Sequence, residues 1–352
     1  MFTPVESLIG ALLIQCSVTS YMLIQGQVIG FSSIIYTMAF APSIHSTSIV
    51  FGIYLSTQFI ARYMMHILPV FALFTAPDGS NPWLISGTME NYVLSGGLVG
   101  FGTCLGCGCT SGHFIAGLSR LRWRSVVAVG CFMFSGVAIV SVLDNGITCV
   151  GGKLPCYAYD PGFHVLKHNQ HVMFPLLGVA FVHSYLWLPV VSRLVKRMGN
   201  PWLIKVQQFY VGMSSGFFFG SGLIVSGMTV YYKVLGFLSM LRLEKFDPSL
   251  MIIAVFVIIP NYFIWKKFIP QSKLECSVKK PILAESYQLN FSNRTPFKFI
   301  IGNLIFGLGW GLAGICPGPG LIGACLSSKI DSMVYWIFSY LGCYTIAKKI
   351  FK

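Results

Sequence analysis

Charged side chains are scarce in this sequence. Only 10% of the 352 residues are Asp, Glu, Lys or Arg, whereas 55% are hydrophobic and the mean hydropathy is +0.73. A soluble globular protein carries about 25% charged residues, so the composition excludes that class. The sequence therefore predicts a protein that crosses a lipid bilayer several times.

Among the charged residues, acidic ones are scarcer than basic ones, and this limits the kind of binding site inside the membrane. The chain has only 10 of them, mostly in loops or at the ends of apolar segments. A cation site or a proton relay would need carboxylates within the spans, so an anionic or neutral substrate is favoured. The net charge of +14 is attributed to cytoplasmic loops rather than to nucleic-acid binding.

Two further signals are missing. The N-terminal stretch MFTPVESLIGALLIQC lacks the basic region and the small-residue cleavage site of a secretory signal peptide, so we expect the first apolar segment to be retained as a span. No segment resembles a nucleotide-binding loop, so an ATP-driven activity would need a separate protein. We expect neither a cofactor nor an enzymatic activity.

Apolar segments long enough to cross a bilayer, about 20 residues each, recur along the chain. They predict an all-α polytopic membrane protein with about nine transmembrane helices. The predicted spans are residues 5–24, 46–74, 90–105, 124–143, 171–190, 207–226, 249–266, 298–316 and 331–348.

Four shorter apolar segments begin at or near glycine, proline or a polar cluster. They are too short to cross the bilayer and are typical of half-helices that dip into the membrane. The predicted half-helices are residues 26–39, 107–119, 229–241 and 318–328.

Basic residues predict the orientation, because lysine and arginine are enriched in cytoplasmic loops. They gather in segments 191–206 and 266–298 and in the C-terminal tail. Even numbers of predicted spans separate these three segments, so all three, including the C-terminus, are predicted to lie in the cytoplasm. The N-terminus and segment 144–170 then lie outside, where Cys149 and Cys156 either form a disulfide or stay free.

The sequence also repeats itself. GFGTCLGCGCTSG (100–112) aligns without a gap with GLGWGLAGICPGP (307–319), which places Cys109 over Cys316. The predicted spans put Cys109 near inner span ends and Cys316 near outer ones, so the repeats are inverted, as in many transporters. We predict a first repeat in residues 1–143, a linking span with its loops in residues 144–206, and a second repeat in residues 207–352.

The aligned motifs CGCTSGH and CPGPG break the helices that carry them. Pro317 and Pro319 stop a helix, and unwound backbone in a membrane is tolerated only where it is buried in protein or lines a wet cavity. The half-helix after each break offers free N–H groups and a partial positive charge, which suit an anion. The candidate anion donors are the hydroxyls of Thr110 and Ser111 and the backbone around Gly108, Gly112, Gly318 and Gly320.

One cysteine stands at each break, Cys109 and Cys316. A thiol is a weak donor and sulphur is polarisable, so it can hydrogen-bond to a soft sulphur atom without holding it permanently. Alternatively, each cysteine fills a small space. His113 lies four residues after Cys109, on the same helix face, and is either a donor facing a pore or a buried histidine with protein partners.

The chain has 11 cysteines, and Cys104 and Cys107 form a CxxC pair beside Cys109. A zinc site usually pairs two cysteine knuckles, and the second break has only Cys316, so we expect no metal site. Redox chemistry at Cys104 and Cys107 would need an exposed thiol with a low pKa. This alternative stays open, although neither cysteine has a counterpart in the second repeat.

At these motifs the sequence resembles the YeeE/YedE membrane family, a sulphur-transport group that includes bacterial thiosulfate transporters. The similar stretches are GCTSGHFIAGLSRL, FGSGLIVSGMTVYYKVLGFL and FGLGWGLAGICPGPGL. The resemblance implies an inverted-repeat fold with two thiol-bearing constrictions, here Cys109 and Cys316, which pass thiosulfate by transient S–H···S hydrogen bonds. The thiosulfate transporters carry a further cysteine in the first half-helix region, where this chain has Ser32 and Ser33.

The residues and the resemblance together predict a transporter or selective pore for a small sulphur-containing anion, thiosulfate or similar. Its partners would be the anion, the lipid bilayer and a soluble sulphur-carrier protein on the cytoplasmic side. Two alternatives are a membrane thiol redox or sulphur-transfer protein that uses Cys104 and Cys107, and a structural or membrane-insertion partner. The predicted substrate-binding residues are Cys109, Cys316, Thr110, Ser111, Gly108, Gly112, His113, Gly318 and Gly320.

Overall fold

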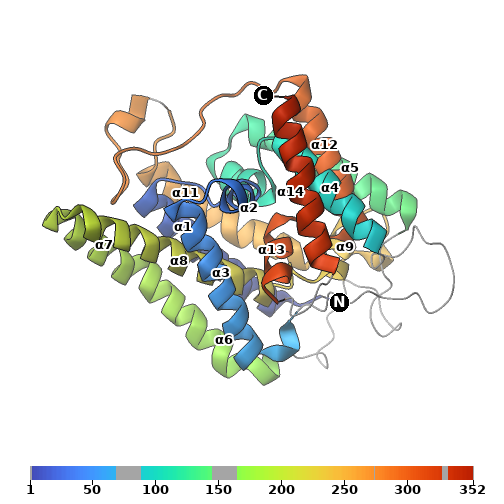
Figure 1. The fold of residues 1–352 in the computed structure, drawn as a ribbon. Helices are drawn as coiled ribbons and strands as arrows, with labels where there is room; N and C mark the ends of the chain where they lie inside the picture. The colour runs from blue at the N-terminus through green and yellow to red at the C-terminus, as the bar shows by residue number, and fades with distance from the viewer. Residues whose placement is uncertain (1, 69–88, 145–164, 273, 327–331, 352) are drawn as a thin grey trace.

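The computed structural model describes residues 2–68, 89–144, 165–272, 274–326 and 332–351, whose regular secondary structure is entirely helical (Figure 1). The π-helix η2 spans Ser111–Gly117. The α-helices are α1 (Pro4–Gln25), α2 (Phe31–Phe40), α3 (Ile44–Tyr63), α4 (Met89–Leu105), α5 (Trp123–Leu143), α6 (Val165–Val182), α7 (Leu188–Met198), α8 (Pro201–Val225), α9 (Tyr231–Leu238), α10 (Ser249–Ile253), α11 (Ile259–Phe268), α12 (Phe297–Ala313), α13 (Pro317–Leu326) and α14 (Ser332–Ile350).

The prediction of an all-α polytopic membrane protein is confirmed. A helix coincides with each predicted span within the described residues. Among the described residues, four helices can each cross a bilayer. Two bent pairs, α2 with α3 and α12 with α13, raise that number to as many as six, so the count of nine stays a prediction. The four that qualify singly are Pro4–Gln25, Trp123–Leu143, Asn169–Met198 and Ser249–Phe268.

Short helices occupy the places of the four predicted half-helices. They are α2, η2, α9 and α13. The bend between α2 and α3 is 107° and that between α12 and α13 is 42°. The break predicted at Pro317 is therefore a real change of chain direction, and a second, sharper bend follows α2. Cys149 and Cys156 lie outside the described residues.

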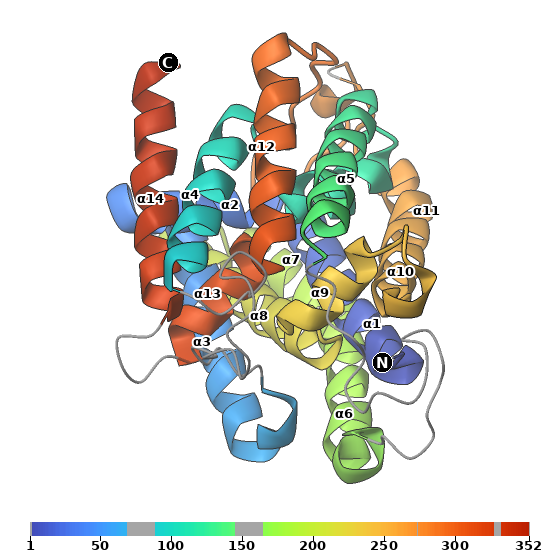
Figure 2. The ribbon, with the colours of Figure 1, turned by 90° about the vertical axis from the view of Figure 1, so that its right-hand side faces the viewer.

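Glycines let the central helices approach closely. A Cβ atom at Gly102 of α4 would overlap the backbone of Phe306 in α12. Gly302 of α12 faces α4 in the same way, against the backbone nitrogen of Gly106. Small residues at such crossings are a common basis for helix association in membranes. The helices α14, α4, α12 and α5 consequently lie side by side (Figure 2).

The two halves of the chain make matching contacts. In order of appearance, α1 corresponds to α8 and α4 to α12, and each of these pairs packs together. The last helix of each half packs in the same way, α5 on α12 and α14 on α4. The helix that follows each short helix also matches, because α3 packs on α8 while α10 and α11 pack on α1. Cys107, with φ of 53°, aligns with Gly314, with φ of 67°. The ungapped alignment of the two motifs therefore extends to the backbone conformation.

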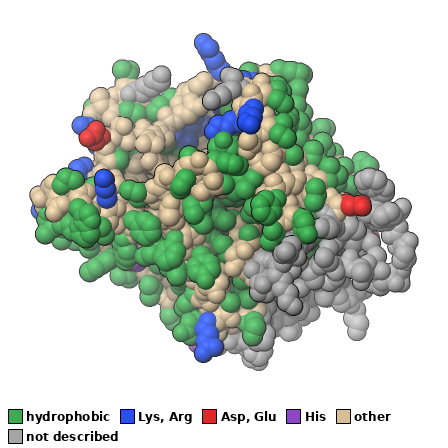
Figure 3. Space-filling view, in the orientation of Figure 1, with side chains coloured by type: hydrophobic (Ala, Val, Ile, Leu, Met, Phe, Trp, Pro, Cys, Tyr) green, Lys and Arg blue, Asp and Glu red, His purple; other side chains and the backbone are tan. Residues whose placement is uncertain are grey.

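The three basic segments come together at one end of the molecule. Lys196 at the end of α7 donates a hydrogen bond to the carbonyl oxygen of Pro281 at 3.5 Å, which joins the first two segments. Lys298 and Lys348 line one common cavity, which joins the second segment to the C-terminal tail. Figure 3 shows basic side chains gathered around a hollow near this end.

Candidate functional site

Each predicted break is a non-helical link, and a buried cysteine stands near the end of each link. After α4 the chain passes through Cys107 and Gly108, with φ of 53° and 155°, before η2 begins. After α12 it passes through Gly314 in the left-handed region before α13 begins at Pro317. Cys109 and Cys316 therefore both lie just before a short helix, and both are buried.

The fold brings the two breaks into contact. Thr110 in the first break donates a hydrogen bond from Oγ1 to Cys316 Sγ in the second, at 3.5 Å. Cys109 Sγ lies 3.2 Å from Ser111 Oγ. Ser111 Oγ also accepts a hydrogen bond from the backbone N–H of Phe31, the first residue of α2, at 3.2 Å. Phe237 of α9 and Gly318 of α13 lie at the same point, so all four predicted half-helix regions meet near the two thiols.

A small cavity of about 40 Å³ lies at this meeting point, and we call it the inner cavity. A space of this size exceeds what one water molecule needs, roughly 10–15 Å³ on this measure, but gives little room for a polyatomic anion. The described conformation is therefore tight at the thiols. The residues that line it include Thr110, Ser111, Cys316 and Gly318, together with the aromatic rings of Phe31, Phe219 and Trp310.

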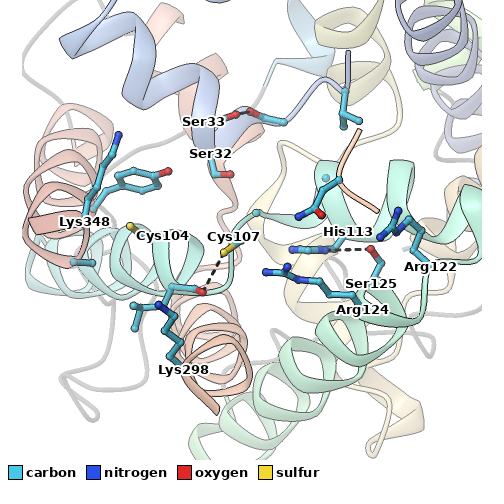
Figure 4. A pocket seen from close by; sticks show the side chains of 18 of the residues that line it. Ser32, Ser33, Cys104, Cys107, His113, Arg122, Arg124, Ser125, Lys298 and Lys348 are labelled. Carbon is cyan, nitrogen blue, oxygen red and sulfur yellow. Dashed lines mark hydrogen bonds between the residues drawn. The ribbon is translucent and has the colours of Figure 1, made fainter. Parts of the chain in front are cut away.

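A second, larger cavity of about 590 Å³ lies at the basic end of the molecule, and we call it the vestibule (Figure 4). Gly108 lines the vestibule and Thr110 lines the inner cavity, so the backbone at Cys109 connects the two linings, while the buried Cys109 itself lines neither space. The vestibule is lined by Ser32, Ser33, Cys104, Cys107, Gly108, Gly112 and His113, and by the basic residues Arg120, Arg122, Arg124, Lys298 and Lys348.

His113 has protein partners for both ring nitrogens. Its Nε2 donates to the carbonyl oxygen of Gly106 at 3.0 Å, because a carbonyl can only accept, and its Nδ1 lies 3.3 Å from Ser125 Oγ. A Cβ atom at Gly108 would come 2.8 Å from this ring. His113 therefore holds the break in shape, although one side of it also faces the vestibule.

The remaining predicted glycines differ in their surroundings. Gly112 faces open space, since a Cβ atom there would meet nothing within 4 Å. Gly318 lines the inner cavity beside Phe31. Gly320 instead packs against the indole ring of Trp336, where a Cβ atom would come within 2.5 Å. Of the three, Gly112 and Gly318 face a cavity and Gly320 has a packing contact.

The sequence motifs pointed to no basic residue at the breaks, and here the reasoning missed part of the site. The arginines of the stretch SRLRWR, directly after η2, line the vestibule together with Lys298 and Lys348. Their alternation right after the motif was a visible signal. Figure 4 shows Arg122 and Arg124 on the side of His113, and Lys348 on the side of Cys104.

The described residues hold no group of three or more His, Cys, Asp or Glu side chains that could bind a metal ion. Cys104 and Cys107 both face the vestibule, and Cys107 is exposed. Among the described parts of the chain, the chemistry available at the breaks is therefore that of thiols, hydroxyls and backbone N–H groups, with basic side chains at the mouth.

Residues 207–346 match a family of unknown function, DUF6691. A probable transporter of Xylella fastidiosa strain Temecula1 is 31% identical over 130 residues, which make up 37% of this chain and 81% of that protein. The chain therefore belongs to the family of this probable transporter. A probable transporter of strain 9a5c is 30% identical over 130 residues, again 37% of this chain and 82% of the relative. Membership of the transporter family and the apolar helices together make the chain an integral membrane protein of the transporter class.

Proposed function

We propose that this protein passes a small sulphur-containing anion across the membrane through two thiol constrictions, Cys109 and Cys316. The observation that carries the proposal is the hydrogen bond from Thr110 to Cys316, which joins the two breaks at one buried point. Since Thr110 donates to the sulphur of Cys316, the S–H of that cysteine is free to donate into the inner cavity. A sulphur atom that enters this cavity would accept that hydrogen bond.

The surroundings of the thiols fit an anion that binds only briefly. The inner cavity is mostly aromatic and aliphatic, so it offers no permanent countercharge. Hydroxyls and half-helix N-termini supply partial positive charge instead. The resemblance to the YeeE/YedE family makes thiosulfate the first candidate. Ser32 and Ser33, at the place of that family's further cysteine, line the vestibule and leave two thiols for the path.

The repeat organisation belongs to the same proposal. Residues 1–143 and 207–352 would be inverted repeats joined by residues 144–206, and the matching helix contacts of the two halves support this division. The Temecula1 relative, with 81% of its length matched to 37% of this chain, is less than half as long. A relative of less than half the length of this chain is expected if one repeat of this chain corresponds to one complete relative.

The orientation and the partner follow from the charges. The three basic segments share one end of the molecule, which the positive-inside rule assigns to the cytoplasm together with the C-terminus. The vestibule then opens to the cytoplasm. A soluble sulphur-carrier protein at this mouth would deliver or receive the anion.

The test is uptake of sulphur-labelled thiosulfate into cells that lack their own sulphur importers. We expect uptake with the unchanged protein and at least a roughly 10-fold loss with Cys109→Ala and with Cys316→Ala, each of which removes a hydrogen bond in a dry site. Cys131→Ala, a half-buried cysteine on α5 outside both cavities, is the matched control. No uptake by protein shown to reach the membrane would remove thiosulfate as the substrate.

The exposure of Cys107 in the vestibule favours one second candidate, thiol redox or sulphur transfer at Cys104 and Cys107. That function predicts sulphur turnover without net flux, and its loss in Cys104→Ala and Cys107→Ala. Uptake that survives both substitutions and fails without Cys109 would exclude it.

A further inference from the structure

The vestibule gathers positive charge from three separate parts of the chain. Arg120 and Arg122 come from the link between η2 and α5, Arg124 comes from the first turn of α5, and Lys298 and Lys348 come from α12 and α14. No Asp or Glu of the described residues lines this cavity or forms an ion pair with any of these five side chains. The vestibule is therefore a concave surface with cations and no described countercharge.

Neutral groups hold the three arginines in place. The guanidinium of Arg124 lies over the ring of Phe299 at 4.4 Å. Arg122 donates to the carbonyl oxygen of Ser292 at 3.0 Å. Arg120 donates from Nε to the carbonyl oxygen of Ala116 at 3.1 Å, and its buried Nη1 has no hydrogen-bond partner among the described residues. These contacts fix the positions of the arginines but do not neutralise them.

The arginines also act on one another. Burial and the nearby charge of Arg122 lower the pKa of Arg120 to about 10. Burial and the nearby charge of Arg124 lower the pKa of Arg122. Arginine stays protonated at pH 7 in either case, so three positive charges repel each other at partly desolvated positions. An anion placed among them would relieve both the repulsion and the missing hydrogen bond.

We propose that Arg120, Arg122 and Arg124 form a binding site for a small, doubly charged tetrahedral oxyanion. Planar guanidinium groups bind such oxyanions through pairs of parallel hydrogen bonds, and a cavity of about 590 Å³ admits one together with water. The proposal rests on the proposed function, because the site would hold the anion at the cytoplasmic mouth of the path, on the side of Cys109. Selection is then split: the arginines recognise charge and shape, and the thiols recognise sulphur.

This division makes sulfate the informative probe. Sulfate has the charge and shape of thiosulfate but no terminal sulphur, so it should bind at the arginines without passing the thiols. The experiment measures equilibrium binding of labelled sulfate to the purified full-length chain in phosphatidylcholine nanodiscs. The variants are Arg120→Met, Arg124→Met and Arg120→Lys, with Arg197→Met on exposed α7 as the matched control.

We expect Arg120→Met and Arg124→Met each to weaken sulfate binding by about 10-fold or more, as the loss of a charged hydrogen bond predicts, and Arg120→Lys to recover part of it. Arg197→Met should bind like the unchanged protein. The Cys109→Ala, Cys316→Ala double variant should also keep sulfate binding, so a failure of the thiol path would not be mistaken for a failure of this site.

Two results would overturn the proposal. One is sulfate binding that neither Arg120→Met nor Arg124→Met weakens, or that the control Arg197→Met weakens by the same factor. The other is binding that disappears when anionic phosphatidylglycerol replaces zwitterionic phosphatidylcholine at an ionic strength that screens surface repulsion, because an anionic lipid headgroup would then occupy the site instead of the free anion. Equal binding in both lipids, lost with Arg120, supports the free oxyanion.

Discussion

Each of the two buried cysteines at the breaks, Cys109 and Cys316, has a hydroxyl partner, and both partners come from the first break. Ser111 serves Cys109 at 3.2 Å and Thr110 serves Cys316 at 3.5 Å. The sequence presented both hydroxyls as direct anion donors. In the fold both hydroxyls lie within hydrogen-bond distance of the thiols, and under the proposed function the hydrogen bond from Thr110 leaves the S–H of Cys316 free to donate.

Thr110→Val tests this orientation with almost no change of side-chain volume. We expect uptake to fall by roughly 3- to 10-fold, the effect of losing one neutral hydrogen bond, while Thr110→Ser keeps most of the rate. The measurement is initial uptake of labelled thiosulfate at equal amounts of protein in the membrane. Equal rates for the valine and serine variants would contradict the role of this hydroxyl.

At the scale of helices, glycine has two separate uses in this chain. At Gly314 it supplies a left-handed turn against α9, where a Cβ atom would come 2.6 Å from the carbonyl oxygen of Tyr231. At Gly102 it allows the backbones of α4 and α12 to approach each other. The first break directly follows α4 and the second directly follows α12. The close packing of these two helices therefore sets the relative position of Cys109 and Cys316.

Gly102→Ala should therefore destabilise the protein, because its methyl group would overlap the backbone of α12. Overpacking of this kind costs about 1–3 kcal/mol. Gly130→Ala in α5 is the matched control, since a Cβ atom there meets nothing within 4 Å, and alanine should leave the helix equal or more stable. The measurement is the thermal unfolding midpoint of each purified variant. Equal midpoints for Gly102→Ala and Gly130→Ala would contradict the packing role of Gly102.

At the scale of the whole molecule, basic side chains from separate segments concentrate at the vestibule. Segments far apart in the sequence, directly after η2, before α12 and at the end of α14, meet around the vestibule (Figure 3). An exposed thiol, Cys107, faces the same space. The accessibility of this thiol therefore reports the side of the membrane to which the vestibule opens.

A chain that keeps Cys107 as its single cysteine should react with a membrane-impermeant maleimide in inside-out vesicles and not in right-side-out vesicles. A second chain has Cys107 replaced as well and carries Arg62→Cys, at the exposed end of α3, as its single cysteine. This chain should react in right-side-out vesicles and not in inside-out vesicles. The measurement is the labelled fraction in the two kinds of vesicle. Labelling of Cys107 only in right-side-out vesicles would reverse the proposed orientation.

The sequence by itself determined the membrane class, the positions of the helices and the breaks with their aligned cysteines, because apolar length, glycine and proline act on the local chain. Only the tertiary structure decided which groups meet. Thr110 reaches Cys316, the arginines after η2 meet Lys298 and Lys348, His113 finds two protein partners and Gly320 packs on Trp336. These contacts join residues from different helices, so they depend on how the helices pack and leave no trace in a local pattern.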